Sequence, residues 1–212
     1  MTRGRFIAFE GGEGMGKSTQ AQLLATELRR LGHTAELTRE PGGTPGAEAI
    51  RDLLLHPPGC GWTAEAEALL FAAARADHVA RKILPAIEAG TWIICDRFID
   101  SSRAYQGIAG GLSDEIVRAL HGIGSAGLVP DLTLVFDVPS DAVASRLAKR
   151  DGDRSDAIGS RSMDYHAAVN QAFRDFALAE PERFIVVDGS GAIEEVHRRV
   201  MDALFSRFGE LA

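Results

Sequence analysis

Short runs of apolar and β-branched residues recur along the chain and predict five β-strands. They cover residues 6–10, 35–39, 91–96, 132–138 and 184–188, and the run at 35–39 is the weakest of them. Because helical patterns separate the strands, right-handed crossovers predict an α/β fold, a parallel sheet with helices on both faces. In such folds the ligand-binding residues lie beyond the carboxyl ends of the strands.

Between these strands, apolar residues recur at the three- and four-residue spacing of amphipathic helices. The first such segment, 17–31, ends before Gly32, and the longest, 63–89, contains Pro85, which predicts a kink or a break. Further helices are predicted over residues 47–55, 114–125, 141–150, 164–178 and 193–208. These helices supply the apolar faces that cover the two sides of the sheet.

Composition narrows the classes of function. With 212 residues, of which 45% are hydrophobic and 25% charged, the chain suits a single globular domain over 1–212. A formal net charge of −7 argues against a general nucleic-acid binder, because such proteins neutralise many phosphates with Lys and Arg. Small phosphates remain possible ligands, since a few arginines can converge in one cleft of an acidic protein.

Other features favour a cytoplasmic protein. The first predicted strand begins within about five residues of Met1 with no signal-peptide pattern, and no apolar run approaches the ~20 residues that cross a membrane. Cys60 and Cys95 lack the spacing of metal ligands, and the apolar run around Cys95 predicts that it is buried. We therefore expect a reducing compartment, and neither a membrane nor a nucleic acid as a partner.

The segment Gly11-x-x-x-x-Gly16-Lys17-Ser18 matches the phosphate-binding loop, with an apolar strand before it and an amphipathic helix after it. Glycines allow backbone N–H groups to surround phosphate oxygens, Lys17 reaches the β- and γ-phosphates, and the Ser18 hydroxyl binds Mg²⁺. Lys17 is one of only three lysines in the chain, which argues against a chance match. The predicted ATP-binding residues are Gly11, Gly12, Glu13, Gly14, Met15, Gly16, Lys17, Ser18 and Thr19.

Asp96 and Arg97 follow the apolar run 92–95, so we expect both side chains at the carboxyl edge of a strand parallel to the first. The carboxylate can hold Mg²⁺ together with Ser18, and the planar guanidinium can bind a phosphate. The two residues could instead form an ordinary pair at a strand end. Their place beside a phosphate loop favours the metal and phosphate roles.

Phe71 and Arg75 lie one turn apart on the predicted helix 63–89, which puts a ring and a guanidinium on the same face. Together they could stack on a base and hydrogen-bond to it. However, an aromatic residue four positions before an arginine is more often a core residue beside a solvated one. The pair alone leaves both interpretations open.

Five segments together resemble bacterial thymidylate kinases. They are Glu10 to Ser18, TREPGGT from Thr38, LLFAAAR from Leu69, DRFIDSSRAYQG from Asp96 and PDLTLVFDV from Pro130. REPGGT and DRxxxSxxAYQG are the most specific, because phosphate loops occur in many enzymes. The resemblance covers nearly the whole chain. It implies a three-layer P-loop kinase fold with a five-stranded parallel sheet, and Mg²⁺-dependent phosphoryl transfer from ATP to dTMP by a homodimer.

The resemblance also implies how the acceptor base binds. Phe71 would stack on thymine and Arg75 would hydrogen-bond its O4 edge. Ser102 and Gln106 would contact the same base. These four residues come from two separate segments, so the fold has to bring them together.

For the rest of the acceptor nucleotide, the resemblance implies that Arg39 and Arg97 hold the 5′-phosphate. Tyr105 would pack near C2′ and disfavour a ribose hydroxyl, and Glu13 stands where the family has an acidic residue near the acceptor sugar. Simpler interpretations remain open at this point. Tyr105 could be an ordinary buried ring, and Arg39 and Arg51 could be solvated surface residues.

Phosphoryl transfer requires two phosphates in line and cations that spread their charge. Lys17, Mg²⁺ held by Ser18, and Arg97 would supply part of that charge. The polar segment at about 149–162, between two predicted helices, is either a surface loop or a mobile lid that adds cations and excludes water.

In this family the extra catalytic arginine lies either in the phosphate loop or in the lid. Gly14, which has no side chain, occupies the loop position, so the resemblance implies that the lid supplies the cation. Arg150 and Arg154 are the leading candidates, with Arg146 and Arg161 behind them. The positively charged residues in this region could instead be solvated side chains at a helix C-terminus, where the helix dipole favours positive charge.

Two other functions stay open from the sequence alone. One is a related P-loop kinase whose acceptor is another nucleoside monophosphate or a nucleoside. A nucleoside acceptor would need a base to accept the hydroxyl proton, and Glu13 or Asp96 is available for this. A nucleotide-dependent switch protein would use its phosphate loop to control partner binding. The guanine-reading sequence Asn-Lys-x-Asp of GTPases is absent from the chain, which argues against the switch.

Overall fold

A computed structural model describes residues 3–139, 143 and 157–209 of the chain and contains the predicted parallel sheet. Its strands are β1 Phe6–Glu10, β2 Ala35–Arg39, β3 Trp92–Asp96, β4 Leu132–Asp137 and β5 Phe184–Asp188. They lie in the order β2-β3-β1-β4-β5, and each neighbouring pair is parallel. The prediction of five parallel strands is confirmed, and the predicted bounds 91–96 and 132–138 are each one residue too long.

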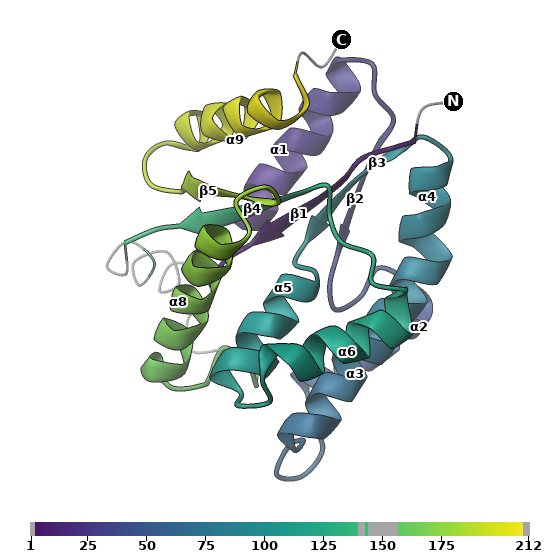
Figure 1. Ribbon diagram of the computed structural model, residues 1–212, viewed down its shortest axis with the longest axis vertical. Helices are drawn as coiled ribbons and strands as arrows, with labels where there is room; N and C mark the ends of the chain where they lie inside the picture. The colour runs from purple at the N-terminus through teal and green to yellow at the C-terminus, as the bar shows by residue number, and fades with distance from the viewer. Residues whose placement is uncertain (1–2, 140–142, 144–156, 210–212) are drawn as a thin grey trace.

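Helices cover both faces of this sheet, which gives the three layers seen in Figure 1. One face carries α1 Lys17–Arg30 and α9 Ile193–Phe208. The elements on the other side are α2 Pro45–Leu55, α3 Ala64–His78, α4 Leu84–Glu88, α5 Ile99–Ser102, α6 Asp114–Ser125 and α8 Met163–Ala179. None of these described helices combines the length and the apolar character that crossing a membrane requires.

Because helices bury the side chains on both faces of the sheet, the strands appear in the sequence as continuous apolar runs. Successive side chains of a strand point to opposite faces, so Ile7 and Phe9 of β1 join the core under α1 and α9, whereas Phe6 joins the opposite core. Cys95 of β3 lies in that second core, as its apolar surroundings predict. Glu10, the last residue of β1, is also fully buried although it is charged.

The long helical pattern 63–89 forms one continuous helical run that is irregular just before Pro85. The helix α3 ends at His78, a π-helical segment follows over Val79–Ile83, and α4 begins at Leu84. Pro85 lies in the first turn of α4, directly after this π-helical segment. Because proline has no N–H to continue the helical hydrogen bonds, the irregular segment lies beside the position where one of them is missing.

The segment after β3 forms a helix that the apolar pattern does not predict. Ile99–Ser102 form α5, and Arg103–Ala109 continue it as a π-helical segment. Asp100 and Arg103 are buried there as an ion pair at 2.8 Å, so the segment lacks the apolar periodicity of an amphipathic helix. The helix predicted at 141–150 lies almost entirely outside the described residues.

Candidate active site

A cavity of about 560 Å³ opens at the carboxyl ends of β1, β2 and β3, where the fold predicts a ligand site. Most of the predicted site residues line it. They are Glu13, Gly14, Met15, Gly16, Lys17, Ser18, Thr19, Arg39, Phe71, Asp96, Arg97, Tyr105 and Gln106. The fold thus gathers residues from separate sequence segments at one edge of the sheet.

The phosphate loop connects β1 to α1. Gly11, Gly14 and Gly16 have φ angles of 129°, 69° and 88°, which side chains disfavour and glycine permits. A Cβ on Gly12 would lie 2.5 Å from Oδ1 of Asn170, so a side chain there would require the Asn170 side chain of α8 to move. Gly16 offers no side chain to cap α1, which leaves the first backbone N–H groups of that helix for an anion.

Lys17 begins α1 and folds back into the loop. Its buried Nζ donates hydrogen bonds to the carbonyls of Gly11 and Gly12, at 3.1 and 2.5 Å. Burial and, second to it, the positive charge of Arg97 lower the pKa of Lys17 to about 7. The ammonium therefore lies in a place where additional negative charge, such as that of a phosphate, stabilises it.

Ser18 and Asp96 meet beside this loop. The Ser18 hydroxyl donates to Oδ2 of Asp96 at 2.5 Å, which joins the start of α1 to the end of β3. A hydroxyl and a carboxylate are the hard oxygen ligands that Mg²⁺ prefers. Within the described residues, no group of three or more His, Cys, Asp or Glu could hold a metal ion alone. Mg²⁺ bound together with substrate phosphates needs only one or two protein carboxylates, so the residues present fit it.

Arg97 is the first residue after β3, and its φ of 71° turns the chain away from the strand. Nη1 donates to the Gly11 carbonyl at 3.1 Å and to Oγ of Ser101 at 3.0 Å, while the guanidinium lies over the Tyr105 ring. The buried Tyr105 hydroxyl has no hydrogen-bond partner of standard geometry among the described residues. The cation predicted for a phosphate thus lies directly beside the phosphate loop.

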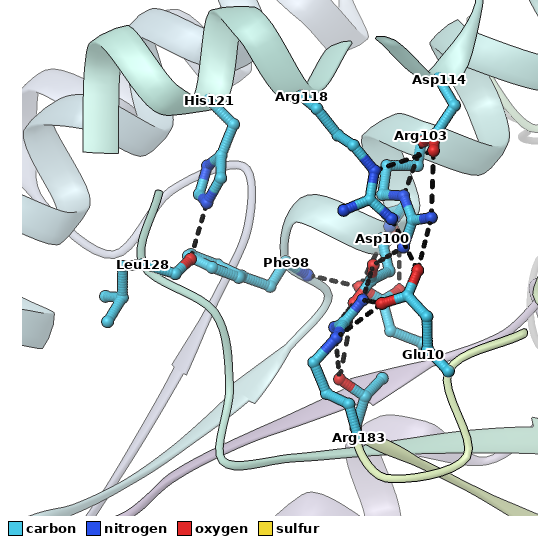
Figure 2. A network of polar contacts seen from close by, with 12 residues as sticks. Glu10, Phe98, Asp100, Arg103, Asp114, Arg118, His121, Leu128 and Arg183 are labelled. Carbon is cyan, nitrogen blue, oxygen red and sulfur yellow. Dashed lines mark hydrogen bonds and ion pairs between the residues drawn. The ribbon is translucent and has the colours of Figure 1, made fainter. Parts of the chain in front are cut away.

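Glu10, which Figure 2 shows in a network of polar contacts, bonds to the turn that follows Arg97. Its carboxylate accepts hydrogen bonds from the backbone N–H groups of Phe98 and Ser101, at 2.8 and 3.1 Å, and from the Ser101 hydroxyl at 2.6 Å. Burial and, second to it, the negative charge of Asp100 raise the pKa of Glu10 to about 7. No motif predicts Glu10 as a site residue; the only signal is a charged residue at the end of an apolar strand.

Arg75 and Ser102, both predicted to contact a base, do not line the cavity. Arg75 is only 3% exposed, and it donates to Oε2 of Glu40 at 2.7 Å and to Oγ of Ser102 at 2.9 Å. The second carboxylate oxygen of Glu40 lies 3.1 Å from Nδ1 of the buried His78. Arg75 is therefore neither a solvated residue nor a wall residue, whereas Phe71 lies in the wall itself.

The loop after β2 supplies a second basic wall. Arg39 is exposed at the end of β2 and pairs with Glu48 at 3.1 Å, while Nη1 of Arg51 donates to the Pro41 carbonyl at 2.8 Å. Both arginines line the cavity, although no motif assigns Arg51 to the site. The Glu40–Pro41 peptide bond in this loop is cis.

Arg161, a secondary candidate for the lid cation, is engaged elsewhere. Its guanidinium pairs with Glu67 and bonds to the Tyr165 hydroxyl, and these side chains line a second cavity of about 300 Å³. Glu67 also accepts a hydrogen bond from Gln106 at 2.8 Å. The other candidates, Arg146, Arg150 and Arg154, lie outside the described residues, as does most of the predicted lid.

Several wall residues were not predicted. Besides Arg51, they are Glu40, Pro41, Leu55, Ser101 and Ile158. Ser101 shows the difficulty most clearly, because two adjacent serines look alike in sequence and only the turn of the chain decides which of them faces the cavity. The structure places Ser101 in the wall and Ser102 against Arg75 behind it.

Comparison with known proteins gives a consistent result. A family model for thymidylate kinase matches residues 9–200, which include every residue that lines the larger cavity. The thymidylate kinase of Rhizorhabdus wittichii is 55% identical over 201 residues, covering 95% of this chain and 97% of that protein. That of Bradyrhizobium sp. (strain ORS 278) is 46% identical over 206 residues, covering 97% of this chain and 91% of that protein.

The fold is similar as well. The crystal structure of thymidylate kinase from Ehrlichia chaffeensis superimposes with a TM-score of 0.77 at 33% sequence identity. The alignment covers 95% of this chain and 98% of that one. The similarity in structure therefore extends over the sheet, the phosphate loop and the helices that form the cavity wall.

The raised pKa of Glu10 predicts a pH-dependent stability. Because this pKa is about 7 in the folded protein against an ordinary value of 4.5, the stabilisation is complete below pH 4.5 and is lost as the pH rises through 7. Glu10→Gln removes the titrating group. Between pH 5 and 8, we expect the free energy of unfolding of the wild type to fall relative to that of the variant by roughly 2–3 kcal/mol.

Urea denaturation of both proteins at four pH values measures this difference, and the shared titrations cancel when the two are subtracted. A difference that stays constant from pH 5 to 8 would show that Glu10 titrates normally.

Proposed function

The chain belongs to the thymidylate kinase family, and we propose that its larger cavity transfers the γ-phosphoryl group of ATP to dTMP, giving dTDP and ADP. The observation that carries this proposal is the contact between the phosphate loop and the strand-end arginine, in which Nη1 of Arg97 lies 3.1 Å from the Gly11 carbonyl. A phosphate held by the loop and a phosphate held by Arg97 would therefore be neighbours. Such proximity is the main requirement of phosphoryl transfer.

The donor nucleotide is assigned to the phosphate loop. The N–H groups of the loop and of the first turn of α1 would surround the β- and γ-phosphates, and Lys17 would neutralise part of their charge. Ser18 and Asp96 would hold Mg²⁺, since their oxygens already lie 2.5 Å apart. When bound, Mg²⁺ neutralises charge on the phosphate oxygens.

The acceptor nucleotide is assigned to the opposite wall. Arg97 and Arg39 would bind the 5′-phosphate, and the ring of Phe71 would stack on thymine. The Tyr105 hydroxyl, buried without a standard hydrogen bond in the described structure, is available to the sugar side of the ligand. Glu13 lines the same cavity, and we assign it to the acceptor sugar.

Gln106 reaches the wall where the base would lie, whereas Arg75 and Ser102 lie one layer behind it. A direct contact of these two residues with thymine therefore requires the wall to open toward them, and it stays a prediction. In the arrangement described, Arg75 fixes Glu40, which itself lines the cavity.

The reaction needs no protein nucleophile. An oxygen of the acceptor phosphate forms the new bond to the γ-phosphorus as the bond to the bridging oxygen breaks and ADP leaves. Arg97 would orient the acceptor oxygen, and Lys17 would stabilise charge on the donor side. We further propose that Arg150 and Arg154, in the segment 149–162, are lid cations that add positive charge around the transferred phosphoryl group.

A substrate panel tests the proposal against its alternatives. We expect ADP release from ATP to be stimulated strongly by dTMP, and far less by dCMP, dGMP, AMP or thymidine. A coupled assay of ADP release measures this. Equal rates with every acceptor, or phosphorylation of thymidine but not of dTMP, would contradict the proposal. Tight GTP binding without dTMP binding would instead support the switch protein.

We also propose that two copies of the chain associate through α3 and α6. Ile116, Leu120 and Ile123 recur on one face of α6, and Ile123 is 87% exposed. Leu69 on the neighbouring α3 is exposed as well. An apolar stripe of this kind on a folded protein marks an interaction surface, and a second copy offers the same stripe in return.

The proposed use of ATP as phosphoryl donor supports the expected cytoplasmic location.

This association predicts a particle of twice the chain mass of 22.7 kDa in sedimentation experiments. Ile123→Glu should shift the protein to the monomer, because a charge within a dimer interface is costly to bury. Leu178→Glu is the matched control, since Leu178 is similarly exposed but lies on α8. A wild-type monomer at assay concentration would refute the dimer.

A further inference from the structure

The backbone at Arg97 has to be held in place by its surroundings. Its φ of 71° lies in the left-handed region, which a residue with a side chain seldom adopts unless other contacts impose it. On one side, the Arg97 N–H donates to the Phe9 carbonyl of β1 at 2.9 Å. On the other side, the chain enters α5, whose first N–H groups need partners.

Glu10 supplies those partners from a different strand. Its Oε1 accepts the N–H groups of Phe98 and Ser101, the two residues that bracket the start of α5. The structure shows no capping side chain from Phe98 itself. The carboxylate of β1 therefore fixes the turn that follows β3, and with it the direction in which the chain leaves Arg97.

A side-chain relay continues this control to the guanidinium. The Ser101 hydroxyl donates to Oε2 of Glu10 at 2.6 Å, which leaves its oxygen lone pairs directed toward Nη1 of Arg97, 3.0 Å away. The same Nη1 donates to the carbonyl of Gly11, the residue that follows Glu10. We propose that Glu10 is a positioning residue that aims Arg97 at the acceptor phosphate through Ser101.

This role rests on the proposed function, and it is separate from substrate contact. Glu10 is fully buried and does not line the cavity, whereas Ser101 does. Because Glu10 ends β1 and Gly11 begins the phosphate loop, one residue connects the donor loop to the acceptor cation. A displacement of the donor loop or of Arg97 is therefore transmitted to the other through hydrogen bonds of 2.6–3.1 Å.

Steady-state kinetics of Ser101→Ala and Ser101→Thr test the relay, since the first removes the hydroxyl and the second retains it. We expect Ser101→Ala to lower kcat/KM for dTMP by about tenfold to a hundredfold, the usual effect of losing a hydrogen bond to a charged group. The KM for ATP should change by less than about twofold. Ser101→Thr should recover most of the activity. Glu10→Gln should lower kcat/KM for dTMP in the same direction as Ser101→Ala.

A double-mutant cycle with Arg97→Ala decides whether the effect passes through the arginine. If Ser101 and Glu10 act by aiming Arg97, Ser101→Ala and Glu10→Gln should change kcat/KM by less than about twofold when Arg97 is already absent. Equal effects in the two backgrounds would overturn the proposal. So would an equal loss of ATP binding, because that would indicate general damage to the phosphate loop.

Glu36→Gln on the edge strand β2 is the control for the same change of side chain, because Glu36 is exposed and lies away from the cavity wall. It should retain wild-type kinetics. The proposed function fails on its own if the wild type does not phosphorylate dTMP. The positioning role fails if the wild type does so but the cycle is additive.

Discussion

Two phosphate groups repel each other, and an active site that joins them must hold both within reach of one another against that repulsion. The parallel sheet meets this constraint by placing the loops after β1, β2 and β3 at one edge. The uncapped N-terminus of α1, Lys17 and Arg97 then surround a single cavity. Each element contributes a positive charge or a dipole that favours an anion in the cavity.

Buried ion pairs lie next to residues of the cavity wall. Arg75 is held by Glu40 at 2.7 Å, and Asp100 by Arg103 and Arg183 at 2.8 and 2.6 Å. Buried ion pairs add little net stability, because desolvation offsets most of their attraction. Removing one partner is costly, however, and the pairs allow few alternative arrangements. We therefore regard these networks as determinants of geometry around the cavity rather than as the source of its stability.

Local patterns predicted much of this site. The strands, the phosphate loop and the irregular helical turn before Pro85 each depend on a few neighbouring residues, so periodicity and glycine spacing suffice to find them. The place of Ser101 in the wall and the role of Glu10 behind it were not predicted. Both involve contacts between the end of β1 and the turn after β3, which lie far apart in sequence. Similarly, the position of Arg75 behind the wall depends on Glu40, 35 residues away in sequence.

The central claim is that the two phosphate sites are halves of one cavity. The most direct measurement is competition by a compound in which five phosphates join the 5′ positions of adenosine and thymidine. If the sites adjoin, one molecule binds per chain, more tightly than either nucleotide, and its presence abolishes the binding of both ATP and dTMP in calorimetry. If the compound displaced only one of the two nucleotides, or if the other still bound beside it, the two phosphate sites would be separate and the claim of a single cavity would be contradicted.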